Sequence, residues 1–299
     1  MSDIVTIASG DLAARIDPVG AQLTSLAYGG VEYLWQADPR WWNRHAPVLF
    51  PIVGVLRNNE ATSAQGPVKL ARHGLARNYE HRIVEQRDDT VTFELTDMAE
   101  TREVFPYAFK LNMSYTLTGP QTLKQAFRVE NTGDVDLPFS VGGHPAFNVP
   151  VPGCDETWED YELVFAEPWT YDSPTIAGPG LLTYDVVNPI VRDADCMPLT
   201  REAFRFDTIM LENVPGNTVT LRGRTSGHGV RVDFEGFPYL GVWAGEGDAP
   251  FVALEPWTGH ATLDTEDDVL EHKRNITILR LARSSSARSP SPCCSFRAG

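Results

Sequence analysis

Short segments that alternate apolar and polar residues recur along the whole chain, and they constrain the fold more than any other feature of the sequence. Turn-forming residues separate them, as at 28–30, 118–120 and 131–134. Alternation with a period of two is typical of a strand with one buried face. Many such strands at close spacing predict an all-β protein, built as a large antiparallel β-sandwich. The clearest candidate strands are 91–95, 111–117, 122–129, 161–165, 218–221 and 230–234.

Evidence for helices and for domain boundaries is slight. Only residues 99–104 and 264–273 have a pattern that would suit a short helix. No repeat of 20–50 residues and no internal linker interrupts the chain, so residues 1–281 are expected to form a single domain. Beyond them, Ser, Arg and Pro occur without hydrophobic periodicity, which predicts a disordered tail over 282–299 that takes no part in the fold.

The composition excludes some classes of partner. The 299 residues carry a formal net charge of −15, so nucleic acid and anionic membrane surfaces are poor partners. We find no secretory signal and no apolar run of about 18 residues that would span a membrane. The cysteines show no metal-ligand spacing, which favours a reducing cytoplasm. They are Cys154, Cys196, Cys293 and Cys294.

The segment Gly-Gly-His-Pro-Ala-Phe-Asn at 142–148 differs from ordinary strand and turn text. Two glycines before His144 are expected to let a ligand approach the backbone closely. Pro145 biases His144 away from the helical region, so the histidine should lie on a stiff, extended element. Histidine can give or take a proton near neutral pH. A structural histidine in a turn at a strand end fits the same residues.

Glu255 follows the apolar run 251–254, which reads as a buried strand. A carboxylate at the end of such a strand, followed by Pro256, should be partly buried. Burial would raise its pKa and suit it to general-base catalysis. The next residue, Trp257, has a face that can pack on a sugar ring. A strand-end carboxylate in a turn hydrogen bond is the structural alternative.

Two further segments carry polar side chains suited to ligands rich in hydroxyl groups. His73 lies between Arg72 and Arg77, and a cationic neighbourhood lowers the pKa of a histidine and favours its neutral form. Arg57 closes the run 46–59 and can donate to hydroxyl oxygens. Each also fits a solvated surface hairpin.

Taken in order, these segments resemble the aldose 1-epimerase family, within it the LacX-like branch of galactose-mutarotase-like proteins. The resemblance covers about residues 3–281, and the 142–148 segment is its most specific part. One departure is Leu75, where this family has Phe, a change that touches no proton-carrying atom. The matching residues are Trp42, 46–51, Arg57, Asn58, 73–77, 142–148, Asp160, Tyr161 and 255–257.

The resemblance implies roles for five residues. His144 matches the general acid that protonates the sugar ring oxygen, and Glu255 matches the general base at the C1 hydroxyl. The positions that bind and orient the sugar are matched by Arg57 and His73, and Asp207 matches an acidic residue that holds ring hydroxyls. Beside them, Trp257 is expected to bind the sugar face. The implied activity is interconversion of the α and β anomers of a hexose, with no cofactor and no metal, in a monomer or a homodimer.

Three alternatives stay open. A hexose-6-phosphate 1-epimerase would need a cationic pocket for the phosphate, for which Arg57, Arg72 and Arg77 are candidates. A non-catalytic carbohydrate-binding protein of the same fold would use aromatic side chains such as Trp243 and Trp257 without needing the acid and base. In a metal-dependent β-fold isomerase, His73, His144 and Glu255 would be ligands, although their spacing is not a ligand signature.

Overall fold

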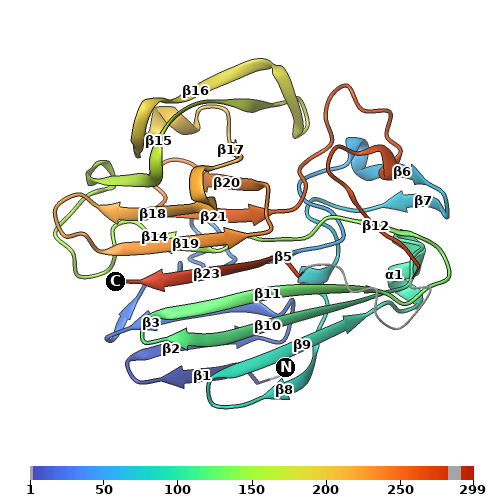
Figure 1. Cartoon of the computed structure of the whole chain (residues 1–299), viewed down its shortest axis with the longest axis horizontal. Helices are drawn as coiled ribbons and strands as arrows, with labels where there is room; N and C mark the ends of the chain where they lie inside the picture. The colour runs from blue at the N-terminus through green and yellow to red at the C-terminus, as the bar shows by residue number, and fades with distance from the viewer. Residues whose placement is uncertain (1–2, 282–290) are drawn as a thin grey trace.

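The computed structural model describes residues 3–281 and 291–299, and strands dominate them (Figure 1). The named strands pair antiparallel throughout, as the alternating pattern predicts. The largest sheet has nine strands, which cross Figure 1 as a ladder from β8 upward. In spatial order they are β16 (Leu181–Pro198), β15 (Tyr161–Ala177), β18 (Thr218–Gly223), β19 (Gly229–Glu235), β23 (Cys293–Ala298), β11 (Thr122–Asn131), β10 (Phe109–Gly119), β9 (Thr90–Thr96) and β8 (Arg82–Gln86).

A six-stranded sheet forms the second layer, and the candidate functional residues Glu255 and Trp257 lie on it. Its central strand is β21 (Phe251–Trp257), which pairs with β20 (Tyr239–Ala244), β13 (Gly142–Gly143) and β14 (Ala146–Asn148). The sheet is completed by β17 (Ile209–Glu212) and β5 (Val48–Leu49). Three smaller sheets contain β1 (Val5–Ser9), β2 (Leu12–Asp17), β3 (Gln22–Tyr28) and β4 (Val31–Glu32); β6 (Glu60–Ser63) and β7 (Gly66–Lys69); and β12 (Leu137–Phe139) and β22 (Thr277–Leu279).

The hydrophobic core lies between these layers. Along β10 every second side chain is buried, which is the alternation that the sequence predicts for this strand. Phe109 and Met113 from β10 share one core with Ile16 of β2 and with Val242 of β20. The predicted all-β sandwich and its candidate strands are therefore confirmed.

The last described residues contradict the prediction for the tail. Residues 293–298 form β23, which lies between β11 and β19 in the interior of the nine-stranded sheet. Cys294, Phe296 and Ala298 are buried on one face of this strand. The prediction of disorder is wrong for these residues. Hydrogen bonding to a strand on each side and burial of one face stabilise β23 although its own strand propensity is weak. The rest of the predicted tail, 282–290, lies outside the described residues.

Helices are short. The segment α1 (Ala99–Val104) forms as expected. Within 264–273, however, only 270–272 form a 3₁₀ turn, because Asp268 has a left-handed backbone and Asp264 and Val269 pair with neighbouring backbone. The remaining 3₁₀ turns are Arg57–Asn59, Ala76–Asn78, Trp158–Asp160, Arg201–Phe204 and Pro215–Asn217. No helix in the described ranges is long and apolar enough to cross a membrane.

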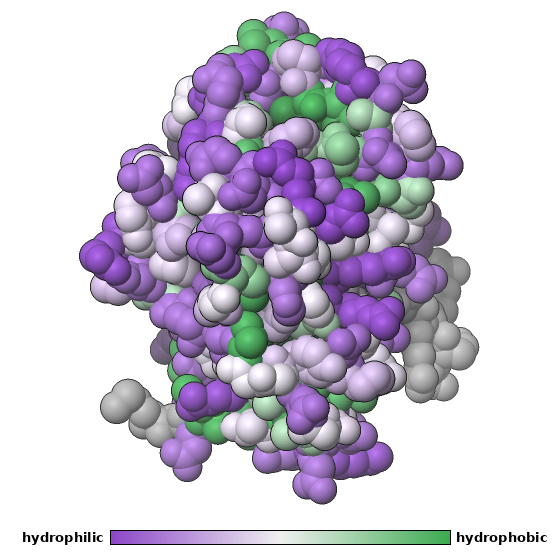
Figure 2. Space-filling view, turned by 90° about the vertical axis from the view of Figure 1, so that its left-hand side faces the viewer, coloured by the Kyte–Doolittle hydropathy of each residue, from purple (hydrophilic) through white to green (hydrophobic). Residues whose placement is uncertain are grey.

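The face of the molecule drawn in Figure 2 is mainly hydrophilic. Figure 2 shows hydrophilic residues over most of one face, with hydrophobic residues in small, separate patches. This distribution agrees with the excess of acidic residues in the sequence.

Candidate active site

The site lies on the face of the six-stranded sheet that points away from the main core. In β21, Val252 and Leu254 enter the main core, so the alternate residues, among them Glu255 and Trp257, point to the opposite face. The residue that pairs with Glu255 across the ladder is Gly241 of β20, which has no side chain. The register therefore places Glu255 beside a position without a side chain, and the Trp257 indole packs over Gly241.

Glu255 is buried, with an exposed fraction of 1%. Burial raises its pKa well above the ordinary value, and the negative charge of Asp207 acts in the same direction. The Trp257 indole and Arg72 oppose the shift. Glu255 lies inside β21 and not at its end as the sequence suggested, but the predicted direction of the pKa shift is the same. Its Oε2 atom is buried without a hydrogen-bond partner among the described residues.

His144 lies between β13 and β14 and faces Glu255. Its Nε2 atom is 3.2 Å from Oε1 of Glu255, and both side chains are almost fully buried. The imidazole stacks on Trp42, with ring centroids 4.9 Å apart. Burial lowers the pKa of His144 to about 3, and the positive charges of Arg77, Arg72 and Arg44 add to this effect.

The two glycines before His144 have a different role from the expected one. A Cβ on Gly142 would lie 2.7 Å from the Pro256 carbonyl oxygen and 2.8 Å from the Trp257 ring. These glycines thus allow close packing of protein against protein, and not of a ligand against the backbone. Their consequence for the site is indirect, because close pairing of β13 with β21 holds His144 near Glu255.

His73 is held by the backbone in a defined tautomer. The Gly54 N–H donates to Nδ1 of His73 at 3.1 Å, so the proton of a neutral imidazole is on Nε2. Its ring centroid is 5.6 Å from that of His144. Its backbone is left-handed (φ 67°), a conformation that is uncommon for residues other than glycine and that recurs at functional sites. Burial lowers the pKa of His73 well below its ordinary value, and His144, Arg77 and Arg72 add to this, as the sequence predicts for its cationic neighbours.

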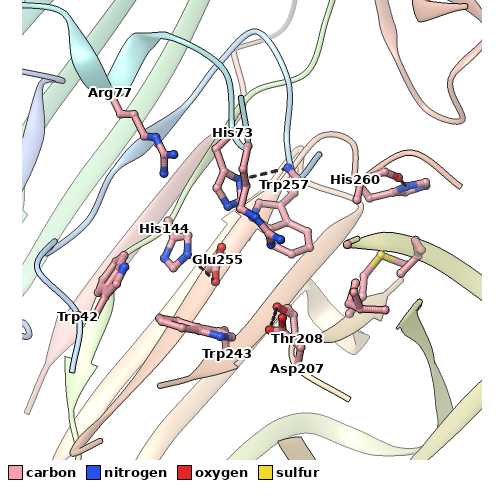
Figure 3. A pocket seen from close by; sticks show the side chains of 17 residues that line it. Trp42, His73, Arg77, His144, Asp207, Thr208, Trp243, Glu255, Trp257 and His260 are labelled. Atoms are coloured by element: carbon pink, nitrogen blue, oxygen red, sulfur yellow. Dashed lines mark hydrogen bonds and ion pairs between the residues drawn. The ribbon is translucent and has the colours of Figure 1, made fainter. Parts of the chain in front are cut away.

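These side chains line one cavity of about 290 Å³. Figure 3 shows Trp42, Trp243 and Trp257 around the His144–Glu255 pair, with Asp207 on the side of the cavity opposite His73. The structure therefore brings together five of the six predicted residues: His144, Glu255, His73, Asp207 and Trp257.

Arg57 is the exception. Its guanidinium forms an ion pair with Asp268 at 3.0 Å and donates to the Leu263 and Asp264 carbonyl oxygens. It does not line the cavity with the other five. The structure therefore does not bring Arg57 to the predicted sugar site, because its donors hold the loop at 263–268.

Other cavity residues were missed by sequence reasoning or given another role. His260, which no motif in the sequence singled out, is buried and lines the cavity. In the sequence, Trp42 is only one of the residues that match the family, without a role. Trp243 is suggested as a sugar-binding residue only for the alternative of a non-catalytic binding protein. Alternation in β20 was the available signal for Trp243, because Leu240 and Val242 enter the main core and the alternate side chains therefore take the other face.

Gly241→Ala should impair the site through packing alone. A Cβ at this position would lie 2.3 Å from the Trp257 indole, so the ring must move toward the cavity. Overpacking of this kind costs about 1–3 kcal/mol, and we expect a lower melting temperature together with a higher KM. Thermal unfolding and steady-state kinetics measure both. Gly119→Ala is the matched control, because its Cβ would meet nothing closer than 3.9 Å. Normal kinetics and stability in Gly241→Ala would contradict the packing argument.

In the described parts of the chain, no group of three or more His, Cys, Asp or Glu side chains is arranged to hold a metal ion. At the site itself, Nδ1 of His73 already accepts from Gly54.

Comparison with known proteins agrees with this fold. The family model for aldose 1-epimerase matches residues 3–275, and the chain belongs to this family. It is 39% identical over 275 residues to the plasmid-encoded protein LacX of Lactococcus lactis subsp. lactis, covering 89% of this chain and 91% of LacX.

Two solved structures show the same fold. A galactose mutarotase related enzyme from Lactobacillus acidophilus aligns with a TM-score of 0.91 at 31% identity, over 99% of this chain and 97% of that one. A galactose mutarotase-like protein from Lactobacillus casei aligns with a TM-score of 0.84 at 28% identity, over 99% and 100%. The architecture is therefore the galactose mutarotase-like β-sandwich.

Proposed function

We propose that this protein is an aldose 1-epimerase that interconverts the α and β anomers of an aldose by opening and closing the sugar ring. The observation that carries this proposal is the contact between His144 and Glu255, two titratable groups 3.2 Å apart and buried in one small cavity. A buried acid and base in contact suit a reaction that removes one proton and delivers another.

In water, a glutamate and a histidine would both be charged at a pH between their two ordinary pKa values. In this site, we infer that the Glu255–His144 pair shares one proton without separating charge. Burial disfavours the carboxylate of Glu255 and the imidazolium of His144, so the neutral carboxylic acid and neutral imidazole are the favoured form of the empty site. The two groups titrate as one unit. Across 3.2 Å the proton can pass from Oε1 of Glu255 to Nε2 of His144, which produces the carboxylate and imidazolium that ring opening needs.

Ring opening then proceeds in one balanced step. Glu255 takes the proton of the C1 hydroxyl, the C1–O5 bond breaks as a C1 carbonyl forms, and O5 takes the proton of His144. Rotation about C1–C2 and the reverse transfers close the ring as the other anomer. Each proton transfer contributes about 10²–10⁴-fold to the rate. No hydride or electron moves, so the proposed reaction requires no cofactor.

Three kinds of side chain would hold the sugar. The Nε2–H of His73 donates, the Asp207 carboxylate accepts, and the indoles of Trp257 and Trp243 offer faces to the C–H groups of the ring. A monosaccharide bound this way places its anomeric centre next to the buried pair. The same aromatic surfaces would suit a binding protein, but a binding protein has no need for the costly burial of Glu255.

The test is exchange NMR on aldoses at anomeric equilibrium, which measures α-to-β interconversion without isolating either anomer. We expect the protein to accelerate interconversion of at least one aldose in a panel of pentoses, hexoses and hexose derivatives. Pre-treatment with a chelator should not change the rate. Saturable binding of a sugar without any acceleration would contradict the proposal and favour the binding protein.

A further inference from the structure

Three arginines cluster at the cavity. Arg72 and Arg77 line it, and Figure 3 shows the Arg77 side chain extending toward His73 and His144. Arg44 is near enough for its charge to act on both Arg77 and His144. Burial lowers the pKa of Arg77 to about 10, and repulsion from Arg44 and then Arg72 contributes. The charges of Arg44 and Arg72 therefore repel that of Arg77 in the empty site.

No carboxylate in the described parts of the chain pairs with any of the three. By contrast, arginines elsewhere form ion pairs with acidic side chains, among them Arg82 with Glu94 and Arg222 with Glu162. The Nε atom of Arg77 is buried and has no hydrogen-bond partner there. In a chain with 40 acidic and 25 basic residues, carboxylates are abundant, so an unpaired cluster is a specific feature of this cavity.

A neutral sugar does not account for this cluster. Hydroxyl groups can accept hydrogen bonds from a guanidinium, but they leave its positive charge uncompensated, and His73 and Asp207 already supply a donor and an acceptor for them. Guanidinium groups match phosphate and carboxylate oxygens much better, through paired, charge-assisted hydrogen bonds. The long-range field of a chain with net charge −15 would repel an anion, but salt screens it beyond about 8–10 Å, so the local cluster decides.

We propose that the substrate is an aldose with an anionic group, a phosphate ester or a carboxylate, and that Arg72, Arg77 and Arg44 bind this group. The proposal rests on the proposed anomer exchange. In an aldohexose the anion cannot be on C1, because the C1 hydroxyl and the ring oxygen must stay free for Glu255 and His144; C6, the other end of the chain, is the position that the experiment tests. The anionic group itself forms and breaks no bond in the reaction.

Binding of the anion would also act on the acid of the pair. The charges of Arg77, Arg72 and Arg44 oppose protonation of His144 in the empty site. An anion that neutralises Arg77 and Arg44 removes their opposition and favours transfer of the proton from Glu255 to His144. Arg72 contributes little to this net effect, because its charge also lowers the pKa of Glu255. An anionic substrate should therefore raise kcat as well as lower KM, which a site that only tethers the substrate would not do.

The experiment compares glucose, glucose 6-phosphate and glucuronate by exchange NMR, in the wild type and in Arg72→Gln and Arg77→Gln. We expect each variant to lose roughly tenfold to hundredfold in kcat/KM on the anionic sugar. The loss on glucose should be at least about tenfold smaller. Arg87→Gln is the matched control, because Arg87 is an exposed arginine that pairs with Glu85. Arg72 is exposed, so its variant should fold even if the Arg77 variant does not.

The arms separate the possible outcomes. Preference for glucose 6-phosphate or for glucuronate supports the proposal and identifies the anion. Faster exchange of glucose than of both anionic sugars would overturn it while the proposed function stands, and so would equal losses on glucose and the anionic sugars in the variants. If no aldose is exchanged, the proposed function fails. Titration calorimetry with sorbitol 6-phosphate then tests separately whether the arginines bind an anionic group. Binding that the wild type shows and the variants lose supports them, and absence of binding to the wild type overturns them.

Discussion

Glu255→Gln should reduce kcat for anomer exchange by at least about a hundredfold, within the range for loss of a general base. The amide has nearly the shape of the carboxyl group but cannot accept the proton of the C1 hydroxyl. KM should change little, because the sugar would be held mainly by His73, Asp207 and the tryptophans. Exchange NMR over a range of sugar concentrations measures both constants. Glu235→Gln, at an exposed position in β19, is the control.

The same variant should be at least as stable as the wild type at neutral pH. The pKa of Glu255 is raised in the folded protein, so its contribution to stability is complete below the unfolded pKa of about 4.5 and is lost as pH rises toward the folded value. The amide removes this loss. Thermal unfolding from pH 4 to 8 should show an advantage for Glu255→Gln that grows with pH. Retention of more than a tenth of kcat, or destabilisation at pH 8, would contradict the assignment.

His144→Gln provides the complementary variant. It leaves O5 without a proton donor, and we expect a loss of similar size. Because the acid and base act in the same step, the double variant should lose little more than either single one. A multiplicative loss would indicate that the two residues act independently.

Removal of residues 291–299 should abolish the native fold. The deletion removes β23 from between β11 and β19, and with it the hydrogen bonds of two ladders. Phe296 is fully buried, and truncation of this one side chain would already cost about 3–5 kcal/mol. A typical total stability is about 5–15 kcal/mol. We expect loss of cooperative thermal unfolding, measured by circular dichroism, and loss of activity with it.

Point variants make this test graded. Phe296→Ala should lower the free energy of unfolding by about 3–5 kcal/mol in a denaturant titration. Arg297→Ala, on the exposed face of the same strand, should have little effect. A shortened chain with native melting temperature and activity would show that β23 is dispensable.

The fold was readable from the sequence because most strands are amphipathic on their own. Alternation in β10 and β11 shows which side chains enter the core, without reference to any partner strand. The segment that became β23 has no such clarity, since Cys294 and Ala298 are weak apolar markers after a polar stretch. It forms a strand because it pairs with β11 on one side and β19 on the other, and these tertiary contacts cannot be predicted from the local sequence pattern.

The site was readable only in part, for a similar reason. Motifs led to His144 and Glu255, but their 3.2 Å contact depends on the register of β13, β14 and β21. Arg57 looked equivalent to Arg72 and Arg77 along the chain. The structure separates them, because Asp268, more than 200 residues away in sequence, engages Arg57 and not the others.

The pairing of β21 with β13 and β14 also bears on how the protein acquires activity. His144 and Glu255 are 111 positions apart in the chain (255 − 144), and His73 is far from both. Contacts between distant segments form late and slowly, because a large loop must close before they contribute. Partly folded chains with many native strands would still lack the acid–base pair. The proposed catalytic activity should therefore report on the completed sheet, and we expect it to be among the last native properties to return on refolding.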